Sequence, residues 1–133
     1  MNAFIVDLTN KPGELAKVTE AIATKGINLT GFSGATCGDS GTLVLVSNDE
    51  TGTRQALSAA GYRAREVELV QASIADRPGG IAEAARQLAN AGVNIEAAFA
   101  TGMSGGNVTI AFATDNPSKA KSALGSFAAA GSR

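Results

Sequence analysis

The chain has 133 residues, of which 44% are hydrophobic and 17% are charged, and its formal net charge is −1 at pH 7. This balance is typical of a soluble globular protein with one ordinary domain or two very small ones, and it offers no positive field to attract nucleic acid or an anionic membrane. The sequence contains no histidine, which excludes histidine-based acid–base catalysis, Ser-His-Asp and Cys-His nucleophile activation, and ordinary zinc sites.

The first predicted elements are a strand and a helix. Residues Ala3–Leu8 form a predicted strand, with Phe4, Val6 and Leu8 on one face and Ile5 and Asp7 on the other. Pro12 is expected in the first turn of the helix that follows, where its missing N–H costs nothing. Leu15, Val18 and Ile22 recur at helical spacing, so they are predicted to form one inward apolar face.

The rest of the first half continues the alternation. Residues Ile27–Ala35 form a predicted strand that buries Ile27, Leu29 and Phe32, and Gly38–Gly41 form a turn. A short strand at Thr42–Ser47 leads to a helix that Asp49 or Thr51 can cap and that runs through Ala60 to Gly61. The chain is extended again from residue 62.

The second half repeats this order of elements. Its predicted segments are strands at Leu69–Ile74, Val93–Thr101 and Val108–Ala113, a turn at Thr101–Gly106, a helix at Pro78–Ala91, and a helix from Asn116-Pro117 to about Phe127. The first of these helices is predicted to direct Ile81, Ala84, Ala85 and Leu88 inward.

The repetition is also visible in short motifs. Asn10-Lys11-Pro12-Gly13 and Asp76-Arg77-Pro78-Gly79 are 66 residues apart, and so are Gly26-Ile27-Asn28-Leu29 and Gly92-Val93-Asn94-Ile95. We therefore predict two repeats, residues 1–67 and 68–133, each with the order βαββαβ. The fold class is α+β, tandem and ferredoxin-like, with the two copies packed side by side into one extended antiparallel sheet and the helices on one face.

The junction and the end of the chain depart from a perfect duplication. Residues Tyr62–Ala75 contain no Gly or Pro, so the last strand of the first repeat is expected to run directly into the first strand of the second. The last strand of the second repeat would begin near residue 128, where the sequence is too short and too small-sided for a convincing strand. We expect it to be missing or frayed, which leaves an edge that needs a partner.

Two glycine-serine strings resemble hydrolase motifs. Gly102–Gly106 matches G-x-S-x-G and Cys37–Gly41 resembles a serine-protease string, but both chemistries need a histidine base. Both strings are therefore interpreted as hairpin turns. Cys37 is interpreted as a small residue at a strand end rather than as a reactive thiol.

The two Pro-Gly loops have a structural and a functional interpretation, which are compatible. Structurally, each is a strand-to-helix turn capped by Asn10 or Asp76. Functionally, the first amides of a helix bind a carboxylate, a glycine allows close approach, and the Asn10 or Asp76 oxygens accept from an ammonium group. That combination suits a zwitterionic amino acid.

Asn28 and Asn94 are poor strand formers at matching positions. Either each completes the turn after the helix, or each directs a polar group at a ligand between the copies. The sequence leaves both alternatives open.

The duplicated pattern Pro-Gly-x-[Leu/Ile]-Ala followed by Gly-[Ile/Val]-Asn-[Leu/Ile] resembles the ACT domain family, whose modules bind amino acids and regulate metabolic enzymes. The resemblance extends to about Leu124 and implies that two modules pair into an eight-stranded sheet with small amino acids bound between them. In the first repeat it implies ligand contacts at Asn10, Lys11, Pro12, Gly13, Glu14, Leu15, Asn28 and Leu29. In the second repeat it implies contacts at Asp76, Arg77, Pro78, Gly79, Gly80, Ile81, Asn94 and Ile95.

The resulting prediction is a stand-alone tandem ACT protein that senses a small amino acid and modulates a separate metabolic enzyme or transporter. We expect no catalysis, metal or cofactor. If only one site works, Asp76 with flexible Gly79-Gly80, facing Asn28, is favoured. The alternatives are a ligand-free interaction or dimerisation module and, third, a small ferredoxin-like enzyme.

The expected setting is cytoplasmic and the expected state a homodimer, without nucleic-acid or membrane partners. No apolar run approaches the ~20 residues of a membrane span, and the first residues lack the basic start of a signal peptide. The single cysteine cannot form an internal disulfide, which suits a reducing compartment.

Overall fold

The computed structural model describes residues 1–127 and confirms the predicted α+β tandem fold class. The elements are β1 (Asn2–Thr9), α1 (Glu14–Ala23), β2 (Leu29–Cys37), β3 (Ser40–Ser47), α2 (Glu50–Ala59), β4 (Ala64–Ala75), α3 (Gly80–Asn90), β5 (Ile95–Ser104), β6 (Asn107–Thr114), α4 (Pro117–Ala123) and the 3₁₀ turn η1 (Gly125–Phe127). The predicted absence of a last strand concerns residues from 128 on, which lie outside the described part of the chain.

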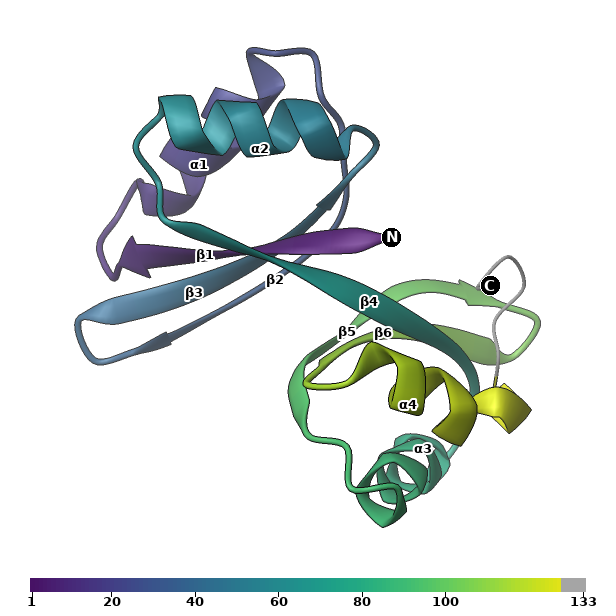
Figure 1. The fold of residues 1–133 in the computed structure, drawn as a ribbon. Helices are drawn as coiled ribbons and strands as arrows, with labels where there is room; N and C mark the ends of the chain where they lie inside the picture. Colours follow the sequence, from purple (N-terminus) through teal and green to yellow (C-terminus); the bar gives the residue numbers. More distant parts are fainter. Residues whose placement is uncertain (128–133) are drawn as a thin grey trace. The chain divides into compact units, whose positions relative to one another are not determined.

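The chain forms two compact units, the first from Asn2 to Val67 and the second from Met1 together with the residues from Glu68 on. Strand β4 contributes to both, so the predicted passage from one repeat to the next without a break is confirmed. The first unit has the strand order β2-β3-β1-β4, and the second has β4-β6-β5 (Figure 1). The neighbouring strands pair antiparallel.

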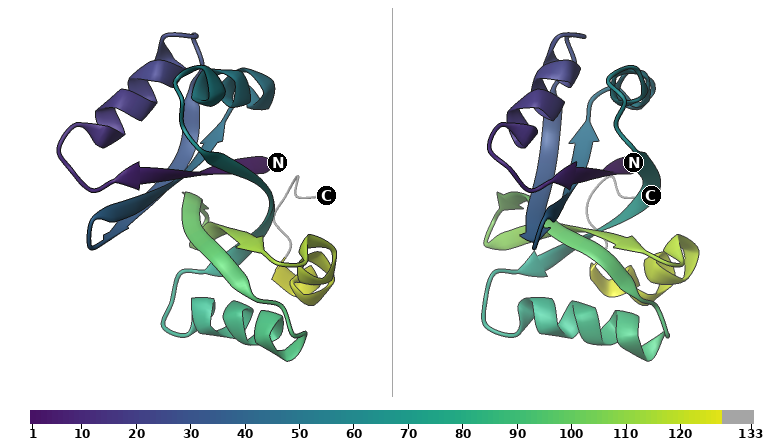
Figure 2. Two further views of the ribbon diagram at one scale, coloured as in Figure 1. Left: turned by 60° about the vertical axis from the view of Figure 1, so that its left-hand side comes forward. Right: turned by 90° about the vertical axis from the view of Figure 1, so that its left-hand side faces the viewer.

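Each unit has its own core between two helices and one face of its strands. Figure 2 shows α1 and α2 on the same side of the first unit's strands. Alternate strand residues point to this side, as the period of two requires. The first core contains Phe4, Val6, Val18, Ile22, Ile27, Leu43, Leu45, Ala56 and Leu57. The second contains Val70, Ala72, Ile74, Ala84, Leu88, Val93, Ile110, Phe112, Ala120 and Leu124.

The two prolines of the loop motifs lie before their helices, so the prediction that they occupy the first turn is wrong. Helix α1 begins after Gly13, which has φ of 90°, and α3 begins after Gly79, which has φ of 87°. A left-handed residue cannot belong to a right-handed helix, and glycine adopts this conformation without steric cost. The prolines therefore shape the turn, and the glycine sets the helix start.

Side-chain capping divides the helices into two pairs. The predicted caps at Asn10 and Asp76 are wrong, because neither α1 nor α3 has a side-chain cap. The predicted caps at Asp49 and Asn116 are confirmed: their side chains accept from the amides of Gly52 and Lys119, at 2.9 and 3.1 Å. The first turns of α1 and α3 consequently keep amides that no side chain satisfies.

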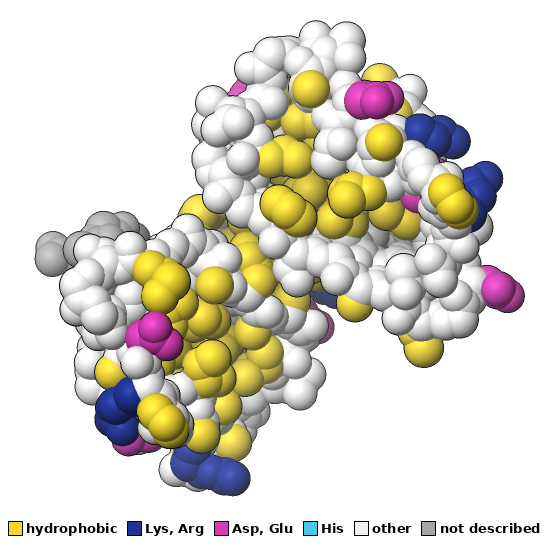
Figure 3. All heavy atoms as spheres, turned by 180° about the vertical axis from the view of Figure 1, so that it is seen from behind, with side chains coloured by type: hydrophobic (Ala, Val, Ile, Leu, Met, Phe, Trp, Pro, Cys, Tyr) yellow, Lys and Arg dark blue, Asp and Glu magenta, His cyan; other side chains and the backbone are white. Residues whose placement is uncertain are grey.

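Three apolar residues that were predicted inward are exposed. The exposed fractions are 49% for Leu15, 56% for Ile81 and 62% for Phe32. Leu15 and Ile81 belong to the first turn of their helices, and Phe32 lies on β2, which is an edge strand of its unit. Figure 3 shows hydrophobic side chains at the surface of both units.

The hairpin of the second unit is tighter than predicted. The turn expected at Thr101–Gly106 is confined to Gly105-Gly106, both with positive φ, because β5 continues to Ser104. Strand β5 also contains an irregularity between Ala100 and Gly102 that adds one residue relative to β6. The helix predicted to reach about residue 127 ends at Ala123 and is followed by η1.

An ion pair links α2 to β4 in the first unit. The Arg54 guanidinium donates from Nε and Nη2 to the two carboxylate oxygens of Glu66 at 2.8 and 3.0 Å, and Asn2 Nδ2 donates to Glu66 at 2.8 Å. The hydrogen bond from Arg54, followed by that from Asn2, lowers the pKa of Glu66. The pair therefore stabilises the fold above the usual titration range of a glutamate, and this stabilisation is lost as pH falls through the lowered pKa.

We predict that Glu66→Gln lowers the free energy of unfolding only modestly at pH 7, since exposed ion pairs contribute little. The free energy of unfolding of this variant should also depend less on pH in the acid range, because the titrating carboxylate is gone. Urea unfolding at pH 7 and at pH 3 measures the difference. Glu68→Gln is the matched control, because Glu68 lies 4.0 Å from Lys121 and makes a weaker pair. Equal pH dependence in the two variants would contradict the role given to Glu66.

Candidate functional site

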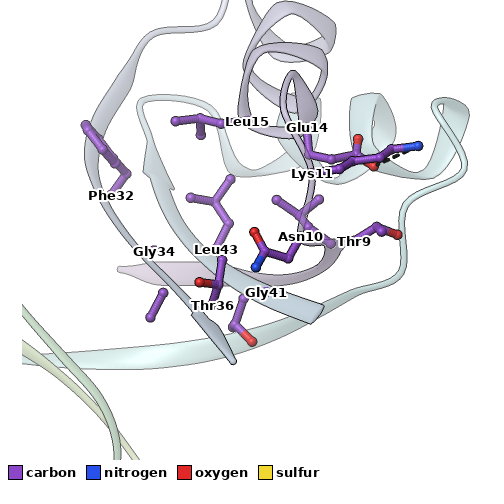
Figure 4. A pocket seen from close by; sticks show the side chains of 13 residues that line it. Thr9, Asn10, Lys11, Glu14, Leu15, Phe32, Gly34, Thr36, Gly41 and Leu43 are labelled. Atoms are coloured by element: carbon purple, nitrogen blue, oxygen red, sulfur yellow. Dashed lines mark ion pairs between the residues drawn. The ribbon is translucent and has the colours of Figure 1, made fainter. Parts of the chain in front are cut away.

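A cavity of about 410 Å³ opens in the first unit between the start of α1 and the β2–β3 hairpin (Figure 4). This volume lies within the range of roughly 300–1,000 Å³ that is usual for small-molecule sites. The lining residues are Leu8, Thr9, Asn10, Lys11, Glu14, Leu15, Phe32, Gly34, Ala35, Thr36, Gly41, Thr42 and Leu43. Apolar walls with a few polar groups are typical of sites that hold small organic ligands.

Two glycines within strands, Gly34 and Gly41, leave space at the floor of the cavity. Gly34 pairs with Leu43, and Thr36 pairs with Gly41, so these residues share the helix-facing side of the hairpin. A Cβ on Gly34 would lie 3.5 Å from Leu43 Cδ1, and one on Gly41 would lie 3.2 Å from Thr36 Cγ2. Any larger side chain at either position would extend from this floor toward the space that the cavity occupies.

Asn10 ties the loop after β1 to the hairpin. Its backbone N–H donates to the Asp39 carbonyl at 2.8 Å, and its Nδ2 donates to the Gly38 carbonyl at 2.9 Å. Figure 4 shows the Asn10 side chain directed toward the hairpin side of the cavity. One N–H of Nδ2 is thus committed to the hairpin, and Oδ1 is the atom with which Asn10 can accept a hydrogen bond from a ligand.

Glu14 places a carboxylate in the wall of the cavity, but its charge is balanced. Its two oxygens lie 3.9 Å from Lys11 Nζ and 3.7 Å from Lys17 Nζ, and its side chain is only 13% exposed. One carboxylate and two ammonium groups leave this cluster with a net charge of +1, which favours an anionic group of a ligand over a second cationic one.

The start of α1 adds hydrogen-bond donors beside the cavity. The first amides of an α-helix have no acceptor within the helix, and they carry the positive end of the helix dipole. The Glu14 amide makes only a long contact with the Lys11 carbonyl, at 3.5 Å. The amides of Leu15 and Ala16 belong to the same uncapped turn, so a carboxylate placed here would be well solvated by the protein.

The predicted contacts of the first repeat divide into two groups. Asn10, Lys11, Glu14 and Leu15 line the cavity, whereas Pro12, Gly13, Asn28 and Leu29 do not. The last two follow the far end of α1, whose ten residues span about 15 Å.

The backbone of Asn28 has a structural role. Its N–H donates to Asn48 Oδ1, and its carbonyl accepts from the Asn48 N–H, each at 3.1 Å. Asn94 repeats this arrangement with Asp115, at 2.9 and 3.2 Å. Each asparagine therefore anchors the entry to a strand through its main chain, and its exposed side chain is left for other contacts.

The loop of the second unit is built differently. Gly80 is buried, and a Cβ added to it would lie 2.3 Å from the Ala75 carbonyl oxygen. Arg77 pairs with Glu83 at 3.2 Å, and the Asp76 amide donates to the Gly106 carbonyl. Gly79 has the left-handed conformation that starts the helix, and Pro78 precedes it. Ile81 is exposed, and Ile95 is the first residue of β5.

The hairpin of the second unit also has larger side chains at the positions that form the floor. Ala100 pairs with Ile110 as Gly34 pairs with Leu43. Gly41 lies two residues before Leu43, and Val108 lies two residues before Ile110, so Val108 is the counterpart of Gly41. Val108 packs against the second core. A valine and an alanine thus replace the two glycines that leave room in the first unit.

Sequence reasoning missed the hairpin as a wall of the site. Phe32, Gly34, Thr36, Gly41 and Leu43 line the cavity, and none of them was proposed as a contact. The available signal was the pair of glycines inside strands, because such glycines often mark a close approach. Their absence at the matching positions of the second repeat was visible in the sequence as well.

Two further properties concern the described residues. Within residues 1–127, no group of three or more Asp, Glu or Cys side chains is placed to hold a metal ion. None of the helices in this part of the chain has the length and apolar character needed to span a membrane.

The family model for an ACT domain pair matches residues 1–125. The chain belongs to the ACT domain pair family. No curated protein sequence matches this ACT domain pair. The resemblance noted from the two Pro-Gly and Gly-x-Asn motifs is thereby confirmed over nearly the whole chain.

Several solved structures are similar to this ACT domain pair in fold. Protein BT0572 from Bacteroides thetaiotaomicron is 26% identical, with a TM-score of 0.79 over 94% of this ACT domain pair and 86% of that chain. The ligand-free regulatory subunit of aspartate kinase from Thermus thermophilus is 18% identical, with a TM-score of 0.65 over 92% and 87%. The regulatory subunit of aspartate kinase from Thermus flavus is 20% identical, with a TM-score of 0.63 over 94% and 91%. At 18% and 20% identity, the likeness to the two aspartate kinase subunits is one of fold alone.

Proposed function

We propose that this ACT domain pair binds a small amino acid in the cavity of its first unit and thereby regulates a separate metabolic enzyme or transporter. The observation that carries the proposal is the cavity itself, which combines apolar walls, the Asn10 acceptor and the uncapped start of α1. The regulatory subunits of aspartate kinase that share the fold support a regulatory role without catalysis. A cytoplasmic location and a homodimer belong to the same proposal.

Each end of a zwitterion has a partner in this arrangement. The carboxylate would accept from the first amides of α1, and the ammonium group would donate to Asn10 Oδ1. The ligand side chain would then lie against Leu8, Phe32 and Leu43, which belong to the cavity wall. We place the site in the first unit rather than in the loop around Asp76, because Gly80 is packed against its own strand and Val108 replaces Gly41.

A thermal-shift screen of the twenty common amino acids tests the proposal. A ligand present at 100 times its dissociation constant should stabilise the protein by about 2.7 kcal/mol. Asn10→Ala should remove most of this gain, whereas Asn28→Ala should retain it, because Asn28 lies beyond the far end of α1. If no amino acid shifts the melting transition, the ligand-binding proposal fails.

A ligand-free interaction module is the second candidate. The exposed Phe32 on edge strand β2 and the exposed Leu15 at the start of α1 favour it, because exposed apolar side chains of this size often mark a protein contact. Strand β2 also contains no charged residue that would discourage pairing. Under this candidate, Phe32→Ser should dissociate a complex without any dependence on amino acids.

A further inference from the structure

A second cleft in the first unit lies between α2 and the beginning of β4. Its volume is about 560 Å³, and its lining residues are Phe4, Arg54, Leu57, Ser58, Gly61, Tyr62, Arg63, Ala64 and Glu66. None of these residues lines the amino-acid cavity. The cleft is therefore distinct from the amino-acid cavity.

The path of the chain at the end of α2 opens this cleft. Gly61 adopts φ of 81°, and the Gly61 and Tyr62 amides donate to the Ser58 and Leu57 carbonyls at 3.0 Å each. This pattern closes the helix with a left-handed residue and turns the chain away from its axis. The strand then begins with Ala64, whose short side chain fills little of the space beside the helix.

The floor of the cleft is apolar, and its one carboxylate is already satisfied. Phe4 and Leu57 are 2% and 1% exposed and belong to the first core. Glu66 accepts two hydrogen bonds from Arg54 and one from Asn2. This fixed pair forms a neutral wall, so Glu66 does not repel an incoming anion as a free carboxylate would.

The mouth of the cleft carries donors without partners. Among the described residues, no carboxylate pairs with Arg63, while its carbonyl accepts from the Asp7 amide at 3.3 Å and so fixes the backbone. The Ser58 and Tyr62 hydroxyls make no hydrogen bond within this part of the structure. One uncommitted guanidinium and two hydroxyls around an apolar floor suit a ligand with an anionic group and an apolar body.

We propose that this cleft binds a small organic anion, a carboxylate or a phosphate ester with an apolar body, independently of the amino-acid site. Arg63 would hold the anionic group, and the apolar part would lie against Tyr62 and Ala64, above the buried Phe4 and Leu57. The ligand would also touch Ala64 and Glu66 at the start of β4, the strand that continues into the second unit.

NMR titration of the full chain with benzoate, phenyl phosphate and benzyl alcohol tests this proposal. Benzoate or phenyl phosphate should shift the amide signals of Ser58, Tyr62, Arg63 and Ala64, and benzyl alcohol should bind about tenfold more weakly because it lacks the charge. A response to benzoate alone assigns a carboxylate ligand, and a response to phenyl phosphate alone assigns a phosphate ester.

Three variants decide which residues are responsible. Arg63→Gln should weaken binding about tenfold, and Lys25→Gln, which removes the same charge beyond the end of α1, should leave binding unchanged. Ser58→Leu should abolish binding by filling the cleft while keeping α2, since leucine favours helices more than serine does. Binding that is equal for the neutral probe, unaffected by Arg63→Gln, or confined to the cavity beside α1 would overturn the proposal.

Discussion

Replacing Gly80 with alanine should lower the free energy of unfolding by about 1–3 kcal/mol, the usual cost of forcing an extra carbon into a packed site. The added Cβ would lie 2.3 Å from the Ala75 carbonyl oxygen and 3.0 Å from Ile74 Cγ2. The backbone oxygen cannot rotate away as a flexible side chain could, so α3 must move from the strand. Urea unfolding followed by circular dichroism measures the loss.

The first unit supplies the matched control at the same position of the repeat. Glu14 is the counterpart of Gly80 and carries a Cβ already, so Glu14→Ala should change stability by no more than about 0.5 kcal/mol. If Gly80→Ala proved as mild as Glu14→Ala, the glycine would have to be explained by a ligand rather than by packing. That result would also restore the preference for the loop around Asp76.

The order of elements could be predicted because it depends on local patterns. The strand pattern of residues 3–8 reflects burial of one face. The helical spacing of Val18 and Ile22 does the same, and both of these side chains are buried. The caps at Asp49 and Asn116 followed from side chains that accept from the next turn. These features need no knowledge of distant residues.

The boundaries around the loop motifs could not be predicted in the same way. A Pro-Gly pair is compatible with proline inside the first turn or with glycine as the left-handed residue before it. The choice depends on how the loop is anchored: the Asn10 amide bonds to Asp39 and the Asp76 amide bonds to Gly106, both across a hairpin. Such contacts between distant segments are not encoded in local spacing.

The candidate site was predicted in part for the same reason. The loop after β1 was recognisable from its motif, and Asn10, Lys11, Glu14 and Leu15 do line a cavity. The opposite wall comes from the hairpin, whose register decides that Gly34 and Gly41 face the helix side. One extra residue in β5 shifts the corresponding register of the second unit, and a comparison of repeats at a constant offset of 66 hides this shift.

Filling the cavity from its floor should abolish the effect of an amino acid without harming the fold. In Gly34→Val, the Cβ makes ordinary contacts with Leu43 Cδ1 at 3.5 Å and the Thr42 carbonyl at 3.6 Å, and the two methyl groups extend into the cavity. We expect the ligand-dependent gain of about 2.7 kcal/mol to disappear. The free protein should change by less than about 1 kcal/mol, since valine favours strands.

Gly102→Val is the control for this prediction, because a Cβ there meets no atom within 4 Å and the residue lies on β5 outside the cavity. It should leave the thermal shift unchanged. Loss of ligand response in both variants would indicate a general effect of valine on the edge strands. A full response in Gly34→Val would remove the cavity of the first unit from consideration and transfer the binding question to the second repeat, where Ala100 and Val108 occupy the corresponding floor.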